Sequence, residues 1–598
     1  MEYKGRILLH ACCGVCASHC VRVLKADGWE PVLFYSNANI WPSEEYTRRL
    51  HAAQQLAEVE QIEFAEDPPD HARWREEAAK GFEECKEGGA RCARCFKYSL
   101  TRAFQSLKEL RCDAFTTSLS VSPHKRSATL HAVGKQVGGN LFIPYDFKKK
   151  DGFLKSTRRA DELGLYRQIY CGCEFSVRHR DPFRTIILGM GYRGRIYARW
   201  ALEHPSDLTV TAIADPDPAI REEWRRKLGL PEDRCFSDWR VAFDGFTAEA
   251  KDAPEAAVIA LPDALHFEAA MLALDKNLHL LLEKPIAATW DDCVALNNEI
   301  KAQQRVVRVG HILRYTPYYR HITDILRSGA LGEVVSIRHI EPVGYAKAAH
   351  AFVRGPFADT ANGTPMIVQK CSHDFDLFSW WIDSPCIAVQ SFGELSHFRP
   401  DQAPADAAAR CTECPKETER NCPFSAVRML RDRADLRYAL PDSSDVGIEK
   451  ELAGRYGRCV YTCNAKAVDH QQVNLLFANG VTVSHSMESF TWGRDRETAI
   501  FLTHGEIRGD ARTITVKNFR TRTETRWDAA LETGNATHES SYVLGNAGLM
   551  HDWVTAMRTL PATERYRSFH SCIQAHAMAF AAEFSRRHNG IAVPLAAL

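Results

Sequence analysis

The sequence lacks several features that define whole classes of protein. No apolar run approaches the roughly 20 residues that a membrane-spanning helix needs. The first residues contain no apolar segment followed by a small-residue cleavage site, so we expect a cytoplasmic protein. The chain also lacks net charge, because 76 basic residues balance 76 acidic ones. With 598 residues and an ordinary composition, we expect a globular protein of about three domains.

Cysteine, by contrast, is abundant. Twenty cysteines in a cytoplasmic chain favour metal or redox use over a disulfide framework. Residues 7–9 are apolar and predict a buried strand, which is followed at once by Cys12, Cys13 and Cys16. Open α/β folds bind their ligands at the carboxyl ends of strands. We therefore predict a metal site here, against the alternative of buried free cysteines.

Two later thiol pairs can join this group. Cys92 and Cys95 lie in GGARCARC, and Cys171 and Cys173 lie in YCGCEFS. Three tight cysteine groups within the first 180 residues are hard to obtain by chance. We predict that the metal-binding cysteines occupy loop positions beside strand ends, close enough together to share one cluster.

The first 180 residues also carry a basic surplus, with 28 Lys+Arg against 23 Asp+Glu, whereas the remainder has 48 against 53. Part of this surplus is concentrated in Lys148, Lys149, Lys150, Lys155, Arg158 and Arg159. Such a run is an ordinary solvated surface or, on a domain that holds a polyanion, a phosphate footprint.

The beginning of the chain has the order strand, helix, strand, which predicts a parallel sheet. We expect these elements at residues 7–9, 20–26 and 32–35. Further helices are expected at residues 44–61, 73–80 and 95–108, a further strand at 114–118, and an extended segment at 141–144.

Six motifs spread over residues 5–176 resemble the epoxyqueuosine reductases of the QueH type. They are HACC, FYSNANI, GARCARC, FTTSLSVSPHK, DFKKKDG and LYRQIYCGC. The resemblance implies a nucleotide-hydrolase-like α/β fold and a 4Fe–4S cluster. It also implies reductive removal of the epoxide oxygen of epoxyqueuosine in tRNA, which gives queuosine and makes this tRNA the partner of the basic run.

The chemistry of the residues agrees with that reaction. Reductive opening of an epoxide needs two electrons, a proton and a Lewis acid, which thiolate-held iron can provide in part. The expected cluster ligands are Cys12, Cys13, Cys92 and Cys95, and Cys16 replaces one of them or holds additional iron. Cys171 and Cys173 are candidates for redox chemistry, although a disulfide between them would be strained.

A glycine-rich loop follows a predicted junction at residues 181–182. A strand at residues 185–188 runs into Gly189, Gly191 and Gly194, and a helix comes next. Gly189 allows a tight turn, Gly191 lets the backbone approach a pyrophosphate, and Gly194 lets helix and strand pack closely. The helix N-terminus then faces the phosphates.

A second apolar strand, at residues 210–214, ends in Asp215, which lies 21 residues after Gly194. A carboxylate there accepts ribose hydroxyls and repels a 2′-phosphate, which favours NAD over NADP. The spacing therefore predicts a dinucleotide site rather than a plain structural turn.

Residues 184–590 resemble the Gfo/Idh/MocA oxidoreductases through the glycine loop, LPDALH, EKP and GHILRY. The resemblance implies that Lys284 of EKP lies beside the nicotinamide and the substrate, where it can polarise a hydroxyl. It also assigns Pro262, His266, Glu283 and Pro285 to the cofactor-binding side, with Glu283 and Pro285 in structural roles.

The same resemblance makes His373 the catalytic histidine, with Asp376 one helical turn further on. A His–Lys pair can move a proton while hydride passes to NAD. Many dehydrogenases of this family have an aspartate four residues before that histidine, and Gln369 stands there instead. This departure leaves a non-catalytic scaffold or a tRNA-binding module open.

A second group of thiols lies further along. Cys411 and Cys414 have the spacing of a metal knuckle, and Cys422, Cys459 or Cys463 can complete four ligands. We predict structural zinc. A second iron–sulfur cluster and unliganded thiols are the alternatives.

The sequence thus predicts an α/β chain of three parts. A nucleotide-hydrolase-like metal domain occupies residues 1–180, a Rossmann domain 181–310, and an α+β substrate domain with a largely antiparallel open sheet 311–598, which includes a cysteine-rich insertion at 405–465. The favoured hypothesis is a fusion of a tRNA epoxyqueuosine reductase with an NAD(P)-dependent oxidoreductase. A sugar or polyol dehydrogenase with an accessory iron–sulfur domain is the rival.

Several partners follow from that hypothesis. No flavin motif is present to split a hydride into single electrons, so we expect an external donor such as a ferredoxin or flavodoxin. The dehydrogenase part needs a small-molecule substrate of its own, and a homo-oligomer is left open.

Overall fold

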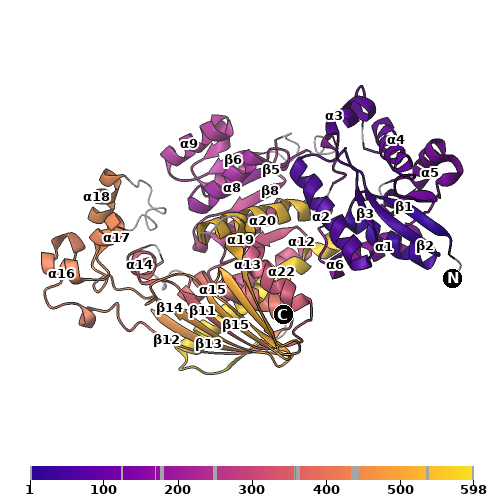
Figure 1. Cartoon of the computed structure of the whole chain (residues 1–598). Coiled ribbons are helices and arrows are strands. Elements are labelled where there is room, and N and C mark those ends of the chain that lie inside the picture. Colours follow the sequence, from indigo (N-terminus) through magenta and orange to yellow (C-terminus); the bar gives the residue numbers. More distant parts are fainter. Residues whose placement is uncertain are drawn as a thin grey trace. The chain divides into compact units, whose positions relative to one another are not determined.

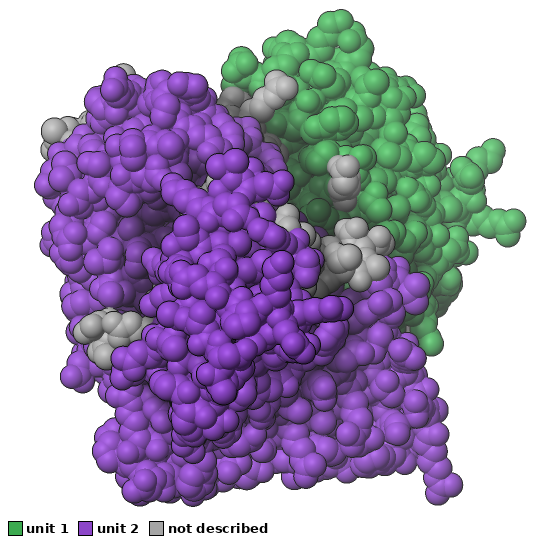
Figure 2. Space-filling model, turned by 90° about the vertical axis from the view of Figure 1, so that its left-hand side faces the viewer, with its two compact units in different colours: residues 1–181 green, residues 182–598 purple. Residues whose placement is uncertain are grey.

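The computed structural model describes residues 3–85, 87–122, 125–166, 168, 170–175, 181–246, 252–355, 357–358, 364–432, 444–533 and 538–595. The chain divides into two compact units, Met1–Asp181 and Pro182–Leu598, which Figure 2 colours separately. We call them unit 1 and unit 2. None of the helices in the described ranges is long and apolar enough to cross a membrane.

Unit 1 contains a four-stranded sheet in the order β3-β2-β1-β4, and all its neighbouring strands are parallel. The strands are β1 (Gly5–Ala11), β2 (Trp29–Tyr35), β3 (Phe64–Glu66) and β4 (Ala114–Thr117). The main helices are α1 (Gly14–Ala26), α2 (Ser43–Glu60), α4 (Ala90–Gln105), α5 (Ser127–Gly138) and α6 (Gly152–Glu162).

The central strand β1 is buried on both faces. Ile7 and Leu9 pack with residues of α1, α2 and α6, whereas Leu8 packs with Leu100 and Ala103 of α4. Successive side chains of a strand point to opposite faces, so one apolar run serves two helical layers. Reactive polar side chains are therefore placed in the residues that follow the carboxyl end of the strand.

Four segments of unit 1 differ from those predicted. Helix α1 begins at Gly14 rather than residue 20, because the Cys13 side chain caps it. Helix α4 begins at Ala90, so the predicted loop position of Cys92 is wrong. The extended segment at 141–144 is reduced to a single bridge between Phe142 and Phe115. Residues 73–80 form the end of α3 (His71–Trp74) and a π-helical turn, Arg75–Ala79.

Unit 2 begins with a six-stranded parallel sheet in the order β10-β9-β8-β5-β6-β7. Its strands are β5 (Phe183–Leu188), β6 (Leu208–Ala214), β7 (Cys235–Phe236), β8 (Ala256–Ile259), β9 (His279–Leu282) and β10 (Val307–Val309). The order reverses between β5 and β8, which is where doubly wound sheets bind ligands. The helices are α8 (Tyr192–Glu203), α9 (Pro218–Leu228), α10 (Trp239–Asp244), α11 (His266–Asp275) and α12 (Trp290–Gln303).

A nine-stranded sheet follows in the order β18-β17-β16-β15-β11-β14-β13-β12-β19 (Figure 1). Its neighbours are antiparallel except β11 and β14, so the predicted largely antiparallel sheet is confirmed. The strands are β11 (Val334–Pro342), β12 (Cys386–Glu394), β13 (His470–Phe477), β14 (Thr482–Glu488), β15 (Glu497–Leu502), β16 (Gly505–Gly509), β17 (Thr513–Asn518), β18 (Thr523–Asp528) and β19 (Val593–Pro594).

The two sheets of unit 2 share buried helices. Helix α15 (Met366–Ile382) packs against α22 (Arg567–Arg587), and both contribute to the core of the nine-stranded sheet. Phe569 and Ile573 of α22, and Trp553 of α20 (His538–Thr559), are buried with residues of the parallel sheet. Unit 2 is therefore compact as a whole, and the finer division at residue 310 stays a prediction.

We expect two separable unfolding transitions, because each unit buries its own core. Leu9→Ala should lower the stability of unit 1 by about 2–5 kcal/mol, and Trp553→Ala that of unit 2 by about 3–5 kcal/mol. Differential scanning calorimetry of both full-length variants checks this. A shift of both transitions by either substitution would contradict it.

Candidate metal and dinucleotide sites

Three thiols meet where β1 ends. The Sγ atoms of Cys12, Cys13 and Cys16 all lie within 4.8 Å of one another, and those of Cys12 and Cys13 are 4.0 Å apart. Cys13 is the N-cap of α1, where its sulfur accepts a hydrogen bond from the Cys16 amide at 3.3 Å. A helix N-terminus favours negative charge, so this turn suits thiolates.

The three thiols differ in the direction in which their pKa is shifted. Hydrogen bonds from the thiols of Cys13 and Cys16 hold the pKa of Cys12 well below its usual value, and Lys125 adds to this. Burial, followed by the hydrogen bond with Cys12, raises the pKa of Cys13 to about 12. Cys12 and Cys13 together hold the pKa of Cys16 well above its usual value. Cys12 is thus the first of the three to lose its proton, and a soft metal ion would displace the protons of the others.

Lys125 connects this group with the later cysteines. Its Nζ lies 3.9 Å from Cys171 Sγ, and the charges of Cys171, Cys12 and Cys16 offset the effect of burial and raise its pKa. Burial, and then Cys171, raise the pKa of Cys95 in α4. The thiols of all three sequence motifs are thus close enough to interact through their charges.

The structure does not gather the four predicted ligands into one tight group. Within the described part of the chain, Cys16 completes the close trio, and Cys92 and Cys95 stay outside it on α4. None of the 20 cysteines forms a disulfide, including the neighbours Cys171 and Cys173. The four-cysteine ligand set and the redox pair therefore stay predictions.

Two polar residues at this site were not singled out from the sequence. Gln168 Nε2 donates to Cys13 Sγ at 2.8 Å, and Ser118 Oγ lies 3.6 Å from Cys12 Sγ. Both stand inside motifs of the QueH resemblance, LYRQIYCGC and FTTSLSVSPHK. Their position inside these motifs was the only feature of the sequence that could have pointed to them, because neither residue type is specific for thiol contacts.

Some side chains of the basic run at residues 148–159 already have partners within unit 1. Arg159 forms ion pairs with Glu60 at 3.3 Å and Glu162 at 3.2 Å, and Lys148 donates to the Lys125 carbonyl. Lys155 and Arg158 are exposed on α6. Lys149, which precedes this helix, is exposed as well, so a phosphate footprint would depend on these three among the described side chains.

The glycine loop of unit 2 has the geometry of a nucleotide turn. Gly189 has φ +87°, and a Cβ there would lie 2.4 Å from the Ala260 carbonyl oxygen. A Cβ on Gly194 would lie 1.9 Å from the Gly189 carbonyl oxygen, so both glycines are required by packing. Gly191 is the N-cap of α8 and faces open space, which leaves room for a ligand.

Asp215 follows β6 and is 9% exposed. Its Oδ2 accepts from the Met190 amide at 2.8 Å and its Oδ1 from the Asp217 amide at 2.9 Å. The carboxylate therefore braces the glycine loop, while its remaining lone pairs can still accept from a ribose. Its role in choosing NAD stays a prediction.

The EKP segment connects the two sheets of unit 2. Lys284 Nζ donates to the Gln369 carbonyl oxygen at 2.5 Å, and burial lowers its pKa against the opposing effect of Asp263. Glu283 accepts from Arg193 at 2.5 Å. His266 has one ring nitrogen 2.6 Å from the Pro285 carbonyl oxygen. Glu283, Pro285 and His266 hold the loops in place, and only Lys284 has a reactive group at the centre.

His373 and Asp376 face different neighbours. The His373 ring lies 5.5 Å from that of His311, and burial, then Lys284, hold the pKa of His373 well below its usual value. Both carboxylate oxygens of Asp376 bind Arg314, at 2.5 and 2.7 Å, and one lies 3.2 Å from His311 Nδ1. The His311 ring thus stands between the carboxylate of Asp376 and the ring of His373 as a shared neighbour.

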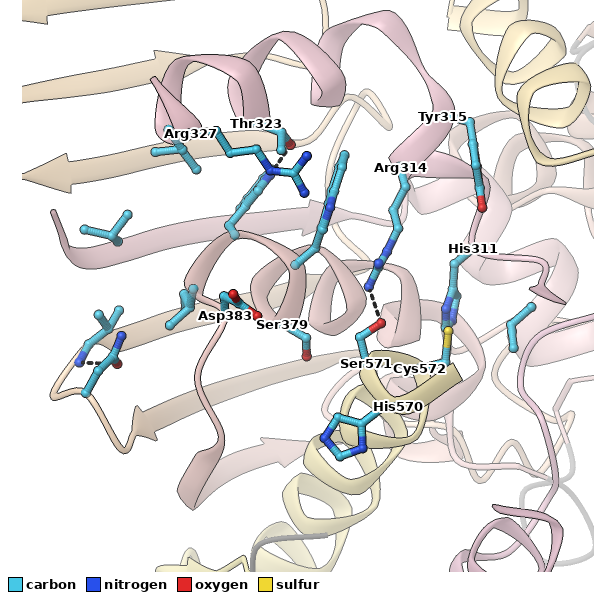
Figure 3. Close-up of a pocket in the computed structure, with 18 of the residues that line it drawn as sticks. His311, Arg314, Tyr315, Thr323, Arg327, Ser379, Asp383, His570, Ser571 and Cys572 are labelled. Atoms are coloured by element: carbon cyan, nitrogen blue, oxygen red, sulfur yellow. Dashed lines mark hydrogen bonds between the residues drawn. The ribbon is translucent and has the colours of Figure 1, made fainter. Parts of the chain in front are cut away.

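A cavity of about 890 Å³ is lined by His311 and Arg314, among other residues. Figure 3 shows Arg314 reaching Ser571, at 2.9 Å, beside His311 and Cys572. His311, Asp376 and Cys572 offer ligand atoms within 4.8 Å of one another. Because Arg314 already neutralises Asp376, we interpret this group as an ion-pair network rather than a metal site.

The second cysteine group surrounds a buried guanidinium. Arg354 donates to Cys411 Sγ at 3.4 Å and to the Phe424 carbonyl oxygen at 2.5 Å. Burial and the nearby Cys411 raise the pKa of Cys422, Cys459 and Cys463. In the described residues, these thiols and Cys414 do not form a group as tight as the one at β1.

Comparison with known proteins agrees with this division. Residues 7–179 match the family model for epoxyqueuosine reductase QueH, and residues 183–311 match the oxidoreductase family with an NAD-binding Rossmann fold, GFO_IDH_MocA. A Streptococcus pyogenes QueH is 34% identical over 187 residues, covering 29% of this chain and 71% of the relative. A Thermotoga maritima QueH is 31% identical, covering 29% and 92%.

Solved structures resemble unit 2 in fold. An inositol dehydrogenase homolog from Azotobacter vinelandii complexed with NAD+ has a TM-score of 0.50 at 16% identity and covers 69% of this chain and 98% of that one. An NAD binding oxidoreductase from Klebsiella pneumoniae gives 0.50 at 16%, covering 70% and 100%. Fold and sites together define an oxidoreductase in which a thiol-bearing α/β unit is fused to an NAD-binding Rossmann unit. By its first unit, the chain belongs to the epoxyqueuosine reductase QueH family.

Replacing one thiol of the trio should reduce metal binding. We expect Cys16→Ser to lower the iron content of the reconstituted full-length protein, because it removes a soft ligand from the tight group. Cys112→Ser is the matched control, since Cys112 bonds to the Leu110 carbonyl and lies outside the trio. Iron analysis and visible absorbance give the answer, and equal iron in both variants would refute a role for Cys16.

Gly191→Ala should weaken NADH binding while the fold is kept, because its Cβ meets no protein atom within 4 Å but enters the predicted pyrophosphate space. We expect the dissociation constant to rise about tenfold, or about 1.4 kcal/mol. Gly454→Ala, at a glycine with ordinary contacts, is the control. Fluorescence titration with NADH measures both, and unchanged affinity in Gly191→Ala would place the cofactor elsewhere.

Proposed function

We propose that unit 1 reduces epoxyqueuosine to queuosine in tRNA and that unit 2 is an NAD-dependent oxidoreductase acting on a small hydroxy or keto compound. The first activity rests on the three thiols at the end of β1, inside the segment that matches the QueH model. Relatives at 34% and 31% identity carry the name epoxyqueuosine reductase, which supports it.

The thiols of unit 1 fit an iron–sulfur cluster, because soft ligands from several motifs converge on one strand end. A 4Fe–4S cluster held by Cys12, Cys13 and either Cys16 or the cysteines of α4 would supply the two electrons. The half-buried ammonium of Lys125 is positioned to offset negative charge on the thiolates and on an oxygen leaving the epoxide. Cys171, next to Lys125, is the better placed of the two proposed redox cysteines.

Two partners follow for unit 1. Lys155 and Arg158, exposed on α6, supply positive charge for tRNA phosphates. A ferredoxin or flavodoxin in the cytoplasm would reduce the cluster between turnovers, because hydride alone cannot deliver single electrons.

In unit 2, NAD would supply the hydride acceptor. Lys284 can polarise the substrate hydroxyl, and His373, kept neutral by burial and by Lys284, can accept its proton. Gln369 accepts from Lys284 through its backbone carbonyl oxygen, which any residue at this position would offer. The absence of an aspartate there is therefore compatible with catalysis by Lys284 and His373.

Structural zinc is our proposal for the cysteine-rich insertion. Cys411, Cys414, Cys422 and Cys463 are its candidate ligands, with Cys459 as a substitute. Arg354, bonded to Cys411, would offset the negative charge of a four-thiolate site.

A reciprocal experiment tests the two activities. In the full-length protein, Cys12→Ala should abolish queuosine formation in epoxyqueuosine-containing tRNA under a chemical reductant, because it removes the thiolate of the trio, and should leave NADH binding unchanged. Lys284→Ala should impair the oxidoreductase reaction of unit 2 and leave queuosine formation intact. Mass spectrometry of the tRNA measures queuosine in both variants. Loss of queuosine in Lys284→Ala would show that the units form one catalytic system.

A further inference from the structure

An exposed tryptophan of unit 1 lies at the end of a stack of rings. The indole of Trp41 packs on the His71 ring with centroids 5.2 Å apart and planes inclined by 24°, and His71 stacks in turn on Trp74 at 5.3 Å. Trp74 is fully buried, whereas Trp41 is 51% exposed. Because His71 covers one side of the indole, the exposed surface of Trp41 lies on the other side and the edges of the ring.

The middle ring of this stack is held in place by polar contacts. His71 Nδ1 lies 2.7 Å from the Ala38 carbonyl oxygen, and Nε2 lies 3.4 Å from a carboxylate oxygen of Glu174. Arg75 Nε lies 3.1 Å from the same oxygen, and its side chain is half exposed. Arg75 therefore offsets the charge of Glu174, so this carboxylate does not repel an approaching phosphate. The indole thus rests on a fixed ring.

The backbone of Trp41 is bound to the cysteine motif YCGC. Its amide donates to the Gly172 carbonyl oxygen at 2.8 Å, and its carbonyl oxygen accepts from the Tyr170 hydroxyl at 2.8 Å. Between these two residues, Cys171 Sγ lies 3.9 Å from the Nζ of Lys125, the ammonium group that connects the cysteine motifs. The indole is therefore anchored to the same segment that carries Cys171 into the proposed thiol site.

A base that reacts inside a protein must first leave its neighbours in the nucleic acid. Enzymes that act on a base take it out of the stack, which leaves the flanking base without a partner on one side. Aromatic side chains replace that partner in proteins that bind single-stranded RNA, because every base has a π face. A fixed, half-exposed indole that is anchored to the reactive segment has the properties that this role requires.

We propose that Trp41 is a stacking site for a nucleobase of the tRNA, namely a base that flanks the modified nucleoside reduced at the thiols. This rests on the proposed reductase function of unit 1. The base packs on the exposed face of the indole, and the basic side chains of α6 attract the phosphates. The stacked base fixes the position of the RNA strand and so brings the modified nucleoside to the thiols.

Binding of epoxyqueuosine-containing tRNA to the full-length protein tests this. We expect Trp41→Ala and Trp41→Leu to raise the dissociation constant about tenfold, because the stacking of a base on an aromatic ring is lost. Trp41→Phe should retain most of the affinity, since it keeps an aromatic face. If the indole were only a packing residue, Trp41→Leu would bind as well as Trp41→Phe. Fluorescence anisotropy of end-labelled tRNA measures the unmodified protein and each variant.

Salt dependence separates stacking from charge. The ratio of the dissociation constants of Trp41→Leu and the unmodified protein should stay constant as salt is raised, because stacking releases no counterions, whereas the loss of a phosphate contact would make it fall. Trp492→Ala, at an exposed tryptophan of unit 2, is the matched control and should bind as the unmodified protein does.

Equal affinity of Trp41→Leu and the unmodified protein, equal affinity of Trp41→Leu and Trp41→Phe, or a ratio that falls with salt would each overturn the proposal. Failure of the unmodified protein to bind this tRNA would instead overturn the proposed function of unit 1.

Discussion

Burial of the parallel strands on both faces is the constraint on which both units depend. The side chains of strand β1 pack against helices on both faces of the sheet, and those of β5 and β9 do the same in unit 2. Such strands have no surface left for chemistry, so reactive groups are confined to the few residues after each strand. Cys12 and Cys13 follow β1, Gly189 follows β5, and Lys284 follows β9 within two residues.

Buried or partly buried arginines repeatedly pair with the buried carboxylates of this arrangement. Arg193 holds Glu283 beside the glycine loop, Arg314 holds Asp376 below His373, and Arg496 joins Glu341 to Asp374. A planar guanidinium can satisfy two acceptors at once, which a lysine does less well. Positions around the proposed catalytic residues are thus fixed by guanidinium groups that each bind two acceptors, whereas Lys284 donates to a backbone carbonyl oxygen.

The sequence predicts those parts of the sites that lie beside a strand end. The apolar run before Cys12 and the glycine spacing after residue 188 were sufficient, because each motif is continuous in the chain. Helix α4 was harder, since GGARC contains no residue that marks a helix start, and Cys92 was placed in a loop. Cys16 joined the trio because a cysteine, unexpectedly, caps α1.

Most contacts between distant segments could not be predicted. The pairing of Asp376 with Arg314 spans 62 residues, and Lys125 meets Cys171 across 46. Lys370 occurs in an ordinary sequence context, and only the fold shows that it is paired with Glu341. The charge balance around a side chain depends on its neighbours in three dimensions. The amino-acid composition does not contain that information.

The burial of α20 and α22 against the parallel sheet has a consequence for synthesis of the chain. Unit 1 is complete once its first 181 residues have left the ribosome, and it can fold then. The Rossmann sheet, although it begins at Phe183, lacks Trp553 and Phe569 until nearly the whole polypeptide has emerged. Its apolar faces therefore stay uncovered for longer during synthesis than those of unit 1, which makes unit 2 the part more prone to aggregate while it is incomplete.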